Sequence, residues 1–180
     1  AATLTADTPG FGTRRSTSVW VRAGILAHEA TIADKESIDA ALRLRAGFPM
    51  GPFELADYTG LDVGLHASDY MANRLGEAYR PAASMRALVD KGMLGKKTGR
   101  GFYEWKDGRA AIALSADQAK SFDPALVLSL VVNEATKPLE QGVASATDID
   151  MACRQGLAFP QGPFEWADAV GVDEVLKNLY

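Results

Sequence analysis

A block of ten residues occurs twice in this chain of 180 residues, first as Phe48-Pro-Met-Gly-Pro-Phe-Glu-Leu-Ala-Asp57 and again as Phe159-Pro-Gln-Gly-Pro-Phe-Glu-Trp-Ala-Asp168. The same offset of 111 residues pairs further identical residues without a gap: Glu29, Ala33, Ile38, Asp39 and Gly60. A period of this length exceeds that of solenoid repeats. The sequence therefore predicts a duplicated small domain, with a second copy that is shortened because it stops soon after Asp173.

Composition narrows the class of protein. Hydrophobic residues make up 47% of the chain, which is enough for a core, and 23 acidic residues against 19 basic ones give a net charge of -4 without a basic stripe. No apolar run approaches the roughly 20 residues that span a bilayer, and no signal segment begins the chain. We expect a cytoplasmic protein that binds neither nucleic acid nor membrane. The single cysteine, Cys153, predicts a buried and inert thiol.

Apolar residues recur at helical spacing through most of the chain, and strand-like alternation is scarce. Prolines suited to a first helical turn, and glycines that follow apolar runs, punctuate the pattern. The sequence predicts an all-α protein with helices near residues 15–31, 37–46, 52–59, 62–79 and 83–91, the first three or four repeated in the second copy. The Gly-, Lys-, Asp- and Ser-rich stretch 95–122 separates two predicted domains, 1–115 and 116–180.

The repeated block has a structural logic of its own. Gly51-Pro52 predicts a turn that begins a helix, with Phe53 facing inward and Glu54 and Asp57 favouring the positive N-terminal turn. On these residues alone, an architectural role is favoured over catalysis.

Other motifs for chemistry are weak. The segment Gly95-Lys-Lys-Thr-Gly-Arg-Gly101 lacks the spacing of a phosphate loop, because Asp90 and Glu104 stand where such loops need glycine. A glycine turn with a solvated basic face is favoured over a contact with an anionic ligand. Two histidines, His28 and His66, are too few for a histidine-based metal site.

Several segments together resemble the C-terminal domain of the 3-hydroxyacyl-CoA dehydrogenase family. They are Asp7-Thr-Pro-Gly-Phe11, Ile38-Asp-Ala-Ala-Leu42, Gly47-Phe-Pro-Met-Gly-Pro-Phe-Glu-Leu-Ala-Asp57, Gly60-Leu-Asp-Val63 and Gly92-Met-Leu-Gly-Lys-Lys-Thr-Gly-Arg-Gly-Phe-Tyr103. The second copy resembles the same domain through Asn133-Glu-Ala135, Gly142-Val-Ala-Ser145, Asp148-Ile-Asp150 and the repeated block. The resemblance covers nearly the whole chain.

The resemblance implies tandem copies of a helical domain like the C-terminal domain of 6-phosphogluconate dehydrogenase. Family members oxidise (S)-3-hydroxyacyl-CoA to 3-oxoacyl-CoA with NAD in fatty acid β-oxidation. The resemblance further implies that an N-terminal Rossmann domain, which these residues do not include, binds NAD and carries the catalytic His-Glu pair and the substrate-binding serine. This chain by itself is therefore expected to bind no cofactor or metal and to be inactive. The implied partners are acyl-CoA, the Rossmann domain and, as in multifunctional enzymes, an enoyl-CoA hydratase domain, with an internal pseudo-dimer or a homodimer.

The resemblance also implies which residues of this chain lie near the substrate. Pro49, Met50, Gly51 and Pro52 are expected near the acyl-thioester, whereas the second copy has Gln161 in place of Met50. Arg14 occupies the position of the family's active-site asparagine, so no catalytic residue is assigned to this chain; arginine has no acceptor and cannot replace an amide. The alternative is a non-catalytic interaction module that scaffolds other β-oxidation proteins.

Overall fold

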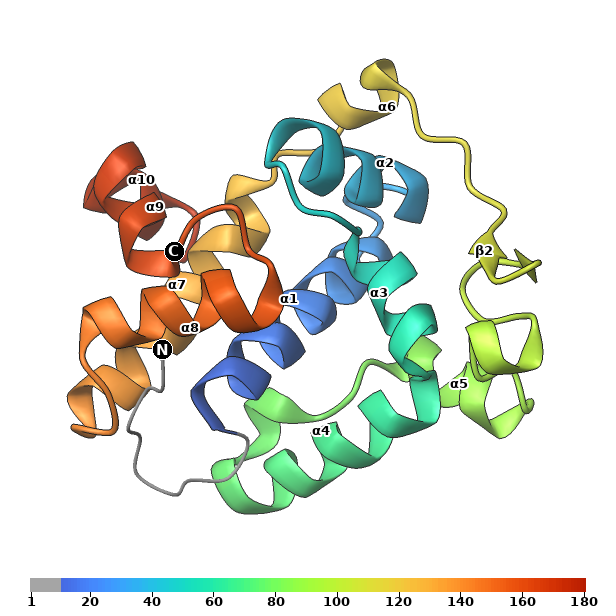
Figure 1. Ribbon diagram of the computed structural model, residues 1–180, viewed down its shortest axis with the longest axis horizontal. Helices are drawn as coiled ribbons and strands as arrows, with labels where there is room; N and C mark the ends of the chain where they lie inside the picture. The colour runs from blue at the N-terminus through green and yellow to red at the C-terminus, as the bar shows by residue number, and fades with distance from the viewer. Residues whose placement is uncertain (1–10) are drawn as a thin grey trace. The chain divides into compact units, whose positions relative to one another are not determined.

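The computed structural model describes the backbone of residues 11–180 and the side chains from Arg15 onward. Within that range the regular secondary structure is helical apart from one small hairpin, in which β1 (Trp105–Lys106) pairs antiparallel with β2 (Arg109–Ala110) (Figure 1). The α-helices are α1 (Phe11–Glu29), α2 (Lys35–Ala40), α3 (Pro52–Thr59), α4 (Leu61–Leu75), α5 (Ala83–Asp90), α6 (Ala116–Lys120), α7 (Ala125–Glu140), α8 (Ala146–Leu157), α9 (Pro163–Val170) and α10 (Val172–Lys177). The predicted all-α class is confirmed.

The chain forms two compact bodies. The central body contains residues 21–122, and the terminal body combines residues 11–20 of α1 with Asp123–Tyr180. One division therefore falls inside α1, so the first half of this helix belongs with the second sequence copy. The domains predicted from the repeat, 1–115 and 116–180, follow sequence similarity and stay a prediction.

The helices of the central body begin and end at residues suited to those positions. The Asp34 side chain accepts a 2.6 Å hydrogen bond from the N–H of Ser37 and caps α2, which continues into a wide π-helical turn over Ala41–Arg45. Pro52 occupies the first turn of α3, and Gly60, with φ 99°, ends it. The predicted range 52–59 matches α3 because both of its ends depend on local chemistry.

The core of the central body gathers the apolar faces of α2, α3 and α4. Its largest fully buried side chains include Ile38, Leu42, Phe53, Leu61 and Met71. The short helix α6 packs on α2 and the π-helical turn, where the Arg45 guanidinium donates to the carbonyl oxygens of Ala119 and Phe122 at 3.1 and 2.8 Å. These bonds satisfy carbonyl groups at and just beyond the end of α6.

The terminal body packs α7 against α9 and α10, and α8 against α9. The first half of α1 joins it through the buried Arg15, whose Nε donates to Glu134 Oε1 at 2.9 Å, and through Trp20, whose ring lies 6.1 Å from that of Phe159. Cys153 is buried as predicted, and burial raises the pKa of its thiol to about 11. The thiol is therefore protonated at neutral pH, in agreement with an inert role.

The duplication extends to unusual backbone conformations. Thr31 and its counterpart Gly142 both have positive φ, 58° and 66°, just after the ends of α1 and α7. Gly47 and its counterpart Ala158 repeat this at 80° and 55°. The two copies thus keep the same turns even where one of them carries a side chain that disfavours the left-handed region.

Among the residues that the structure describes, none of the helices is both long enough and apolar enough to cross a membrane.

Exchanging the residues at one of these paired turns provides a stability test. Thr31 is exposed, and a β-branched residue at positive φ is strained, so Thr31→Gly is expected to stabilise the central body by up to about 1 kcal/mol. The reciprocal Gly142→Thr is expected to destabilise the terminal body by a similar amount, although a Cβ there would meet open space. Urea unfolding of the full chain measures both. A change of the same sign in both variants would contradict the prediction.

Candidate functional site

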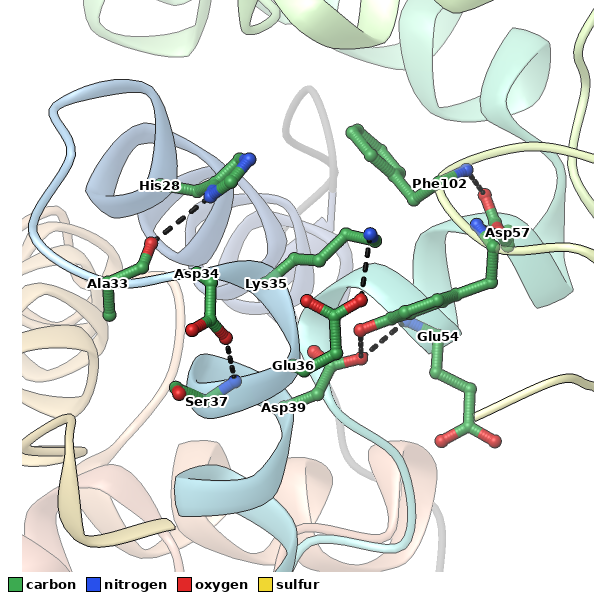
Figure 2. A network of polar contacts seen from close by, with 11 residues as sticks. His28, Ala33, Asp34, Lys35, Glu36, Ser37, Asp39, Glu54, Asp57 and Phe102 are labelled. Carbon is green, nitrogen blue, oxygen red and sulfur yellow. Dashed lines mark hydrogen bonds and ion pairs between the residues drawn. The ribbon is translucent and has the colours of Figure 1, made fainter. Parts of the chain in front are cut away.

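A buried carboxylate, Asp39, holds the start of helix α3. Asp39 Oδ1 accepts from the N–H of Phe53 at 3.0 Å. Its Oδ2 accepts from the N–H of Glu54 at 3.1 Å (Figure 2). Tyr103 adds a third bond, from its hydroxyl to Oδ2 at 3.0 Å. Asp39 lies on α2, so its side chain satisfies N–H groups of the first turn that have no partner inside α3.

The surroundings of Asp39 are apolar enough to change its titration. Burial raises the pKa of Asp39 to about 7, against the opposing effect of the hydrogen bonds from Phe53, Glu54 and Tyr103. Burial of the phenol, together with the nearby Asp39 carboxylate, raises the pKa of Tyr103 above its ordinary value, so the hydroxyl stays protonated and donates. The Tyr103 hydroxyl is therefore the donor in its bond with ionised Asp39.

Two of the four residues expected near an acyl-thioester are buried and serve this junction. A Cβ on Gly51 would lie 2.2 Å from the Asp39 carboxyl carbon and 2.5 Å from its Cα, so only glycine fits there. Pro52 is almost fully buried, and a Cβ on Gly24 of α1 would come within 2.5 Å of its ring. Gly51 and Pro52 let α1, α2 and α3 approach closely.

The other two residues form the outer edge of the same segment. Pro49 is exposed and Met50 is partly exposed, between the buried Phe48 and the buried Gly51. The segment is fixed at one end by the Phe48 N–H, which donates to the Leu42 carbonyl at 3.1 Å, and at the other by the α3 junction. Pro49 and Met50 are thus presented by a firmly held turn.

A second buried carboxylate, Asp57, holds the glycine-rich segment. Asp57 accepts from the N–H of Phe102 at 2.9 Å (Figure 2). It also accepts from the N–H of Tyr103 at 2.8 Å and from the Trp105 indole at 3.0 Å. Added Cβ atoms on Gly95 or Gly101 would come within 2.3 and 2.1 Å of Asp57 atoms. These glycines are explained by close packing on α3, and not by a phosphate group.

The cations of this segment have partners nearby. Lys97 pairs with Asp62, and the Lys96 ammonium lies 4.3 Å from the centre of the Tyr58 ring. Lys97 is exposed and Lys96 is partly exposed beside the glycine turn.

The second copy repeats the first junction. Asp150, the counterpart of Asp39, accepts from the N–H groups of Phe164 and Glu165 at 2.9 and 3.1 Å. Gly162 is again closed to any side chain, with its added Cβ 2.3 Å from the Asp150 carboxyl carbon. An ion pair is also duplicated: Arg43–Glu54 at 3.0 Å in the first copy and Arg154–Glu165 at 3.4 Å in the second.

Acid-base chemistry has few candidate groups here. His28 Nδ1 lies 3.1 Å from the Ala33 carbonyl oxygen and His66 Nδ1 lies 2.7 Å from that of Asp62, so both histidines serve local turns. Among the described residues no group of three or more His, Cys, Asp or Glu side chains could hold a metal ion. The Arg14 side chain lies outside the described residues.

Sequence reasoning missed the central role of Asp39. It assigned the N-terminal turn of α3 to Glu54 and Asp57, whereas Glu54 pairs with Arg43 and Asp57 binds the glycine segment. The useful signal was in the duplication itself, since Asp39 and Asp150 recur at the same distance before each Gly-Pro-Phe-Glu block.

The family of the chain follows from comparison with known proteins. The model of the 3-hydroxyacyl-CoA dehydrogenase C-terminal domain matches residues 10–105 and again 126–180. These matches cover most of the chain and correspond to the two sequence copies. The chain belongs to this family, and the resemblance inferred from its motifs is confirmed.

Individual relatives agree. The mitochondrial hydroxyacyl-coenzyme A dehydrogenase of Rattus norvegicus is 47% identical over 106 residues, covering 56% of this chain and 32% of that protein. The fatty acid oxidation complex subunit alpha of Vibrio campbellii is 32% identical over 158 residues, covering 80% of this chain and 22% of that protein. The crystal structure of 3-hydroxybutyryl-CoA dehydrogenase from Escherichia coli K12 matches with a TM-score of 0.81 at 25% identity, over 97% of this chain and 56% of that chain. This chain therefore spans only part of each relative.

The buried carboxylates predict an unusual dependence of stability on pH. The folded state binds the Asp39 proton more tightly than the unfolded state, in which the carboxyl titrates near 3.8, so stability is lost as pH rises from about 4 to about 7 and is not lost further above that. Burial also raises the pKa of Asp57, which acts in the same direction. Urea unfolding followed by NMR signals of α2 and α3 is expected to give a higher midpoint at pH 5 than at pH 8.

The variant Asp39→Asn tests whether titration of Asp39 causes this pH dependence of stability. The amide cannot accept from both N–H groups, so at pH 7 the variant is expected to lose roughly 1–3 kcal/mol, and its midpoint is expected to change less between pH 5 and 8. Asp117→Asn, at an exposed position, is the control and is expected to keep the wild-type pH dependence. An unchanged pH dependence in Asp39→Asn would show that another group titrates.

Proposed function

We propose that this chain is the helical substrate-binding and assembly region of an NAD-dependent 3-hydroxyacyl-CoA dehydrogenase, which converts (S)-3-hydroxyacyl-CoA to 3-oxoacyl-CoA in fatty acid β-oxidation. In this proposal, Pro49 and Met50 contact the acyl-thioester, and Gly51 and Pro52 support them from beneath. The observation that carries the proposal is the match of both copies to the C-terminal domain of this dehydrogenase family.

The local structure is consistent with such a role. Methionine offers a flexible and polarisable apolar surface, which suits acyl chains of different shape. It stands on a segment tied to α2 and α3, so its backbone position is defined before any ligand arrives. In the second copy Gln161 is exposed at the same place, and a polar amide is a poorer surface for an acyl chain. We assign acyl-CoA contact to the first copy and packing to the second.

The NAD of the complete enzyme belongs, in this proposal, to a Rossmann domain outside these residues. The glycine-rich segment of this chain does not fit a dinucleotide: Gly95 and Gly101 are packed on Asp57, and the N–H groups of Phe102 and Tyr103 donate to that carboxylate. An enoyl-CoA hydratase domain is a further proposed neighbour, as is pairing of two helical copies within a chain or between chains.

Two reciprocal substitutions test the assignment of Met50. In the enzyme that contains this chain together with its NAD-binding domain, Met50→Gln is expected to raise the KM for 3-hydroxyacyl-CoA about 5- to 30-fold, which corresponds to roughly 1–2 kcal/mol of lost apolar contact. Gln161→Met, which makes the opposite change at the equivalent turn, is expected to leave KM unchanged. Unfolding midpoints control for stability. Equal KM values in Met50→Gln and wild type would exclude Met50 from the site.

The proposal also predicts what the isolated chain cannot do. Pure 180-residue protein mixed with NAD and (S)-3-hydroxybutyryl-CoA is expected to form no NADH, measured by absorbance at saturating substrate. A complete enzyme assayed in parallel provides the positive control. NADH formation in proportion to the concentration of the isolated chain would overturn the assignment of cofactor binding and catalysis to another domain.

The alternative proposal is a non-catalytic module that scaffolds other β-oxidation proteins. Arg14, at the position of the family's active-site asparagine, favours it. Arg14→Asn in the NAD-binding form of the protein discriminates between the two, because an enzyme that uses this position is expected to change its kcat, whereas a scaffold has no turnover with either residue.

A further inference from the structure

One residue of the glycine-rich segment joins the two buried carboxylates. The backbone N–H of Tyr103 donates to Asp57 Oδ2 at 2.8 Å, and the hydroxyl of the same residue donates to Asp39 Oδ2 at 3.0 Å. Asp57 lies on α3, whereas Asp39 lies on α2 and accepts from the Phe53 N–H at the start of α3. The bonds therefore form a closed circuit that runs from α2 to α3, from α3 to Tyr103, and from Tyr103 back to α2.

The turn that carries Met50 lies directly against this circuit. A Cβ on Gly51 would lie 2.2 Å from the Asp39 carboxyl carbon, so the backbone that follows Met50 rests on the Asp39 side chain with no room for another atom between them. Two residues further on, the Phe53 N–H donates to Asp39 Oδ1 at 3.0 Å. A change in the orientation of the Asp39 carboxylate therefore displaces the backbone beside Met50.

We propose that Tyr103 is a positioning residue for acyl-CoA binding, which acts through the Asp39 carboxylate on the turn that carries Met50. The inference rests on the proposed function, in which Met50 contacts the acyl-thioester. Tyr103 itself touches no substrate in this arrangement. Its hydroxyl fixes the orientation of the Asp39 carboxylate, and that carboxylate in turn fixes the backbone at Gly51.

The Tyr103 hydroxyl holds Asp39 from outside helix α3. The N–H groups of Phe53 and Glu54, which also donate to this carboxylate, both belong to α3. Asp39 is fully buried and Tyr103 is 5% exposed, so bulk water does not reach the carboxylate to replace a lost bond. Because hydrogen bonds to a charged acceptor are stronger than those between neutral groups, loss of this hydroxyl is expected to change how the carboxylate is held.

Protonation of Asp39 gives this coupling a measurable signature. Burial raises the pKa of Asp39 to about 7, and its hydrogen bonds oppose that rise. At lower pH one carboxylate oxygen becomes a donor and accepts less well from the N–H groups of α3, so the turn at Met50 is expected to change with pH. The charged and titratable groups around Asp39 and Tyr103 come from α1, α2, the π-helical turn and α3: His28, Lys35, Glu36, Arg43, Glu54 and Asp57. All of them stay unchanged in the variants below.

The methyl signal of Met50 tests the coupling in the full chain without substrate. In protein labelled with methyl-13C methionine, the Met50 signal, assigned with Met50→Leu, is expected to titrate with a midpoint near pH 7. Tyr103→Phe is expected to raise that midpoint by about one pH unit, because the ionised carboxylate loses a donor. Asp39→Asn is expected to abolish the titration. Tyr58→Phe, which removes a hydroxyl from a half-exposed tyrosine of the same helix α3, is the matched control and is expected to keep the wild-type midpoint.

The pH profile of KM tests the consequence for binding. In the enzyme that contains this chain together with its NAD-binding domain, Tyr103→Phe is expected to displace the KM profile for 3-hydroxyacyl-CoA upward by the same interval of pH. The maximal kcat is expected to stay within about twofold of wild type, since Tyr103 acts on binding and not on the reacting atoms. A merely structural role of Tyr103 would lower the urea midpoint and leave both pH profiles where they are in wild type and Tyr58→Phe.

The outcomes separate this inference from the proposed function. An identical Met50 titration in Tyr103→Phe and wild type would overturn the coupling. A shifted Met50 titration with an unchanged KM profile would overturn the positioning role in binding. In that last case, the KM of Met50→Gln decides the proposed function: a raised KM retains Met50 as a substrate contact, whereas an unchanged KM removes the acyl-CoA assignment as well.

Discussion

The junction between a buried aspartate and the next helix start determines the architecture of both copies. Asp39 and Asp150 each accept two backbone N–H groups of the following helix, over distances that differ by at most 0.1 Å between copies. The interaction aligns a carboxylate with the positive end of a helix, and it requires glycine where the two backbones approach. The repeated Gly-Pro-Phe-Glu sequence is the helix half of that junction.

This dependence explains what sequence reasoning could and could not predict. The range of α3 follows from Pro52 and Gly60, because both act on the residues beside them. Asp39 bonds to residues 14 and 15 positions further along the chain, and Asp57 to residues 45 and 46 positions further. Such partners are set by packing, which local patterns do not encode. The π-helical turn after α2 was missed for the same reason, since Arg45 within it serves the end of α6.

The candidate site was predicted as four neighbouring residues, and the structure divides them by burial. Gly51 and Pro52 lie inside the junction, whereas Pro49 and Met50 lie at its surface. Neither composition nor periodicity separates these pairs, because all four belong to one short turn. What separates them is the position of Asp39 and Gly24 beneath the turn. A ligand at this edge would contact Met50 directly. Gly51 would affect the ligand only by fixing the backbone conformation of the turn.

Divergence between the copies is concentrated where the junction does not constrain the chain. Residues that build the junction are retained, as Gly162 and Asp150 show, whereas the surface turn changes from Met50 to Gln161. Because Asp39 and Asp150 hold the helices from within, each copy can change its outer surface without losing its fold. In the first copy Asp57 takes on a second structural task at that outer surface, because it binds the backbone of the glycine-rich segment.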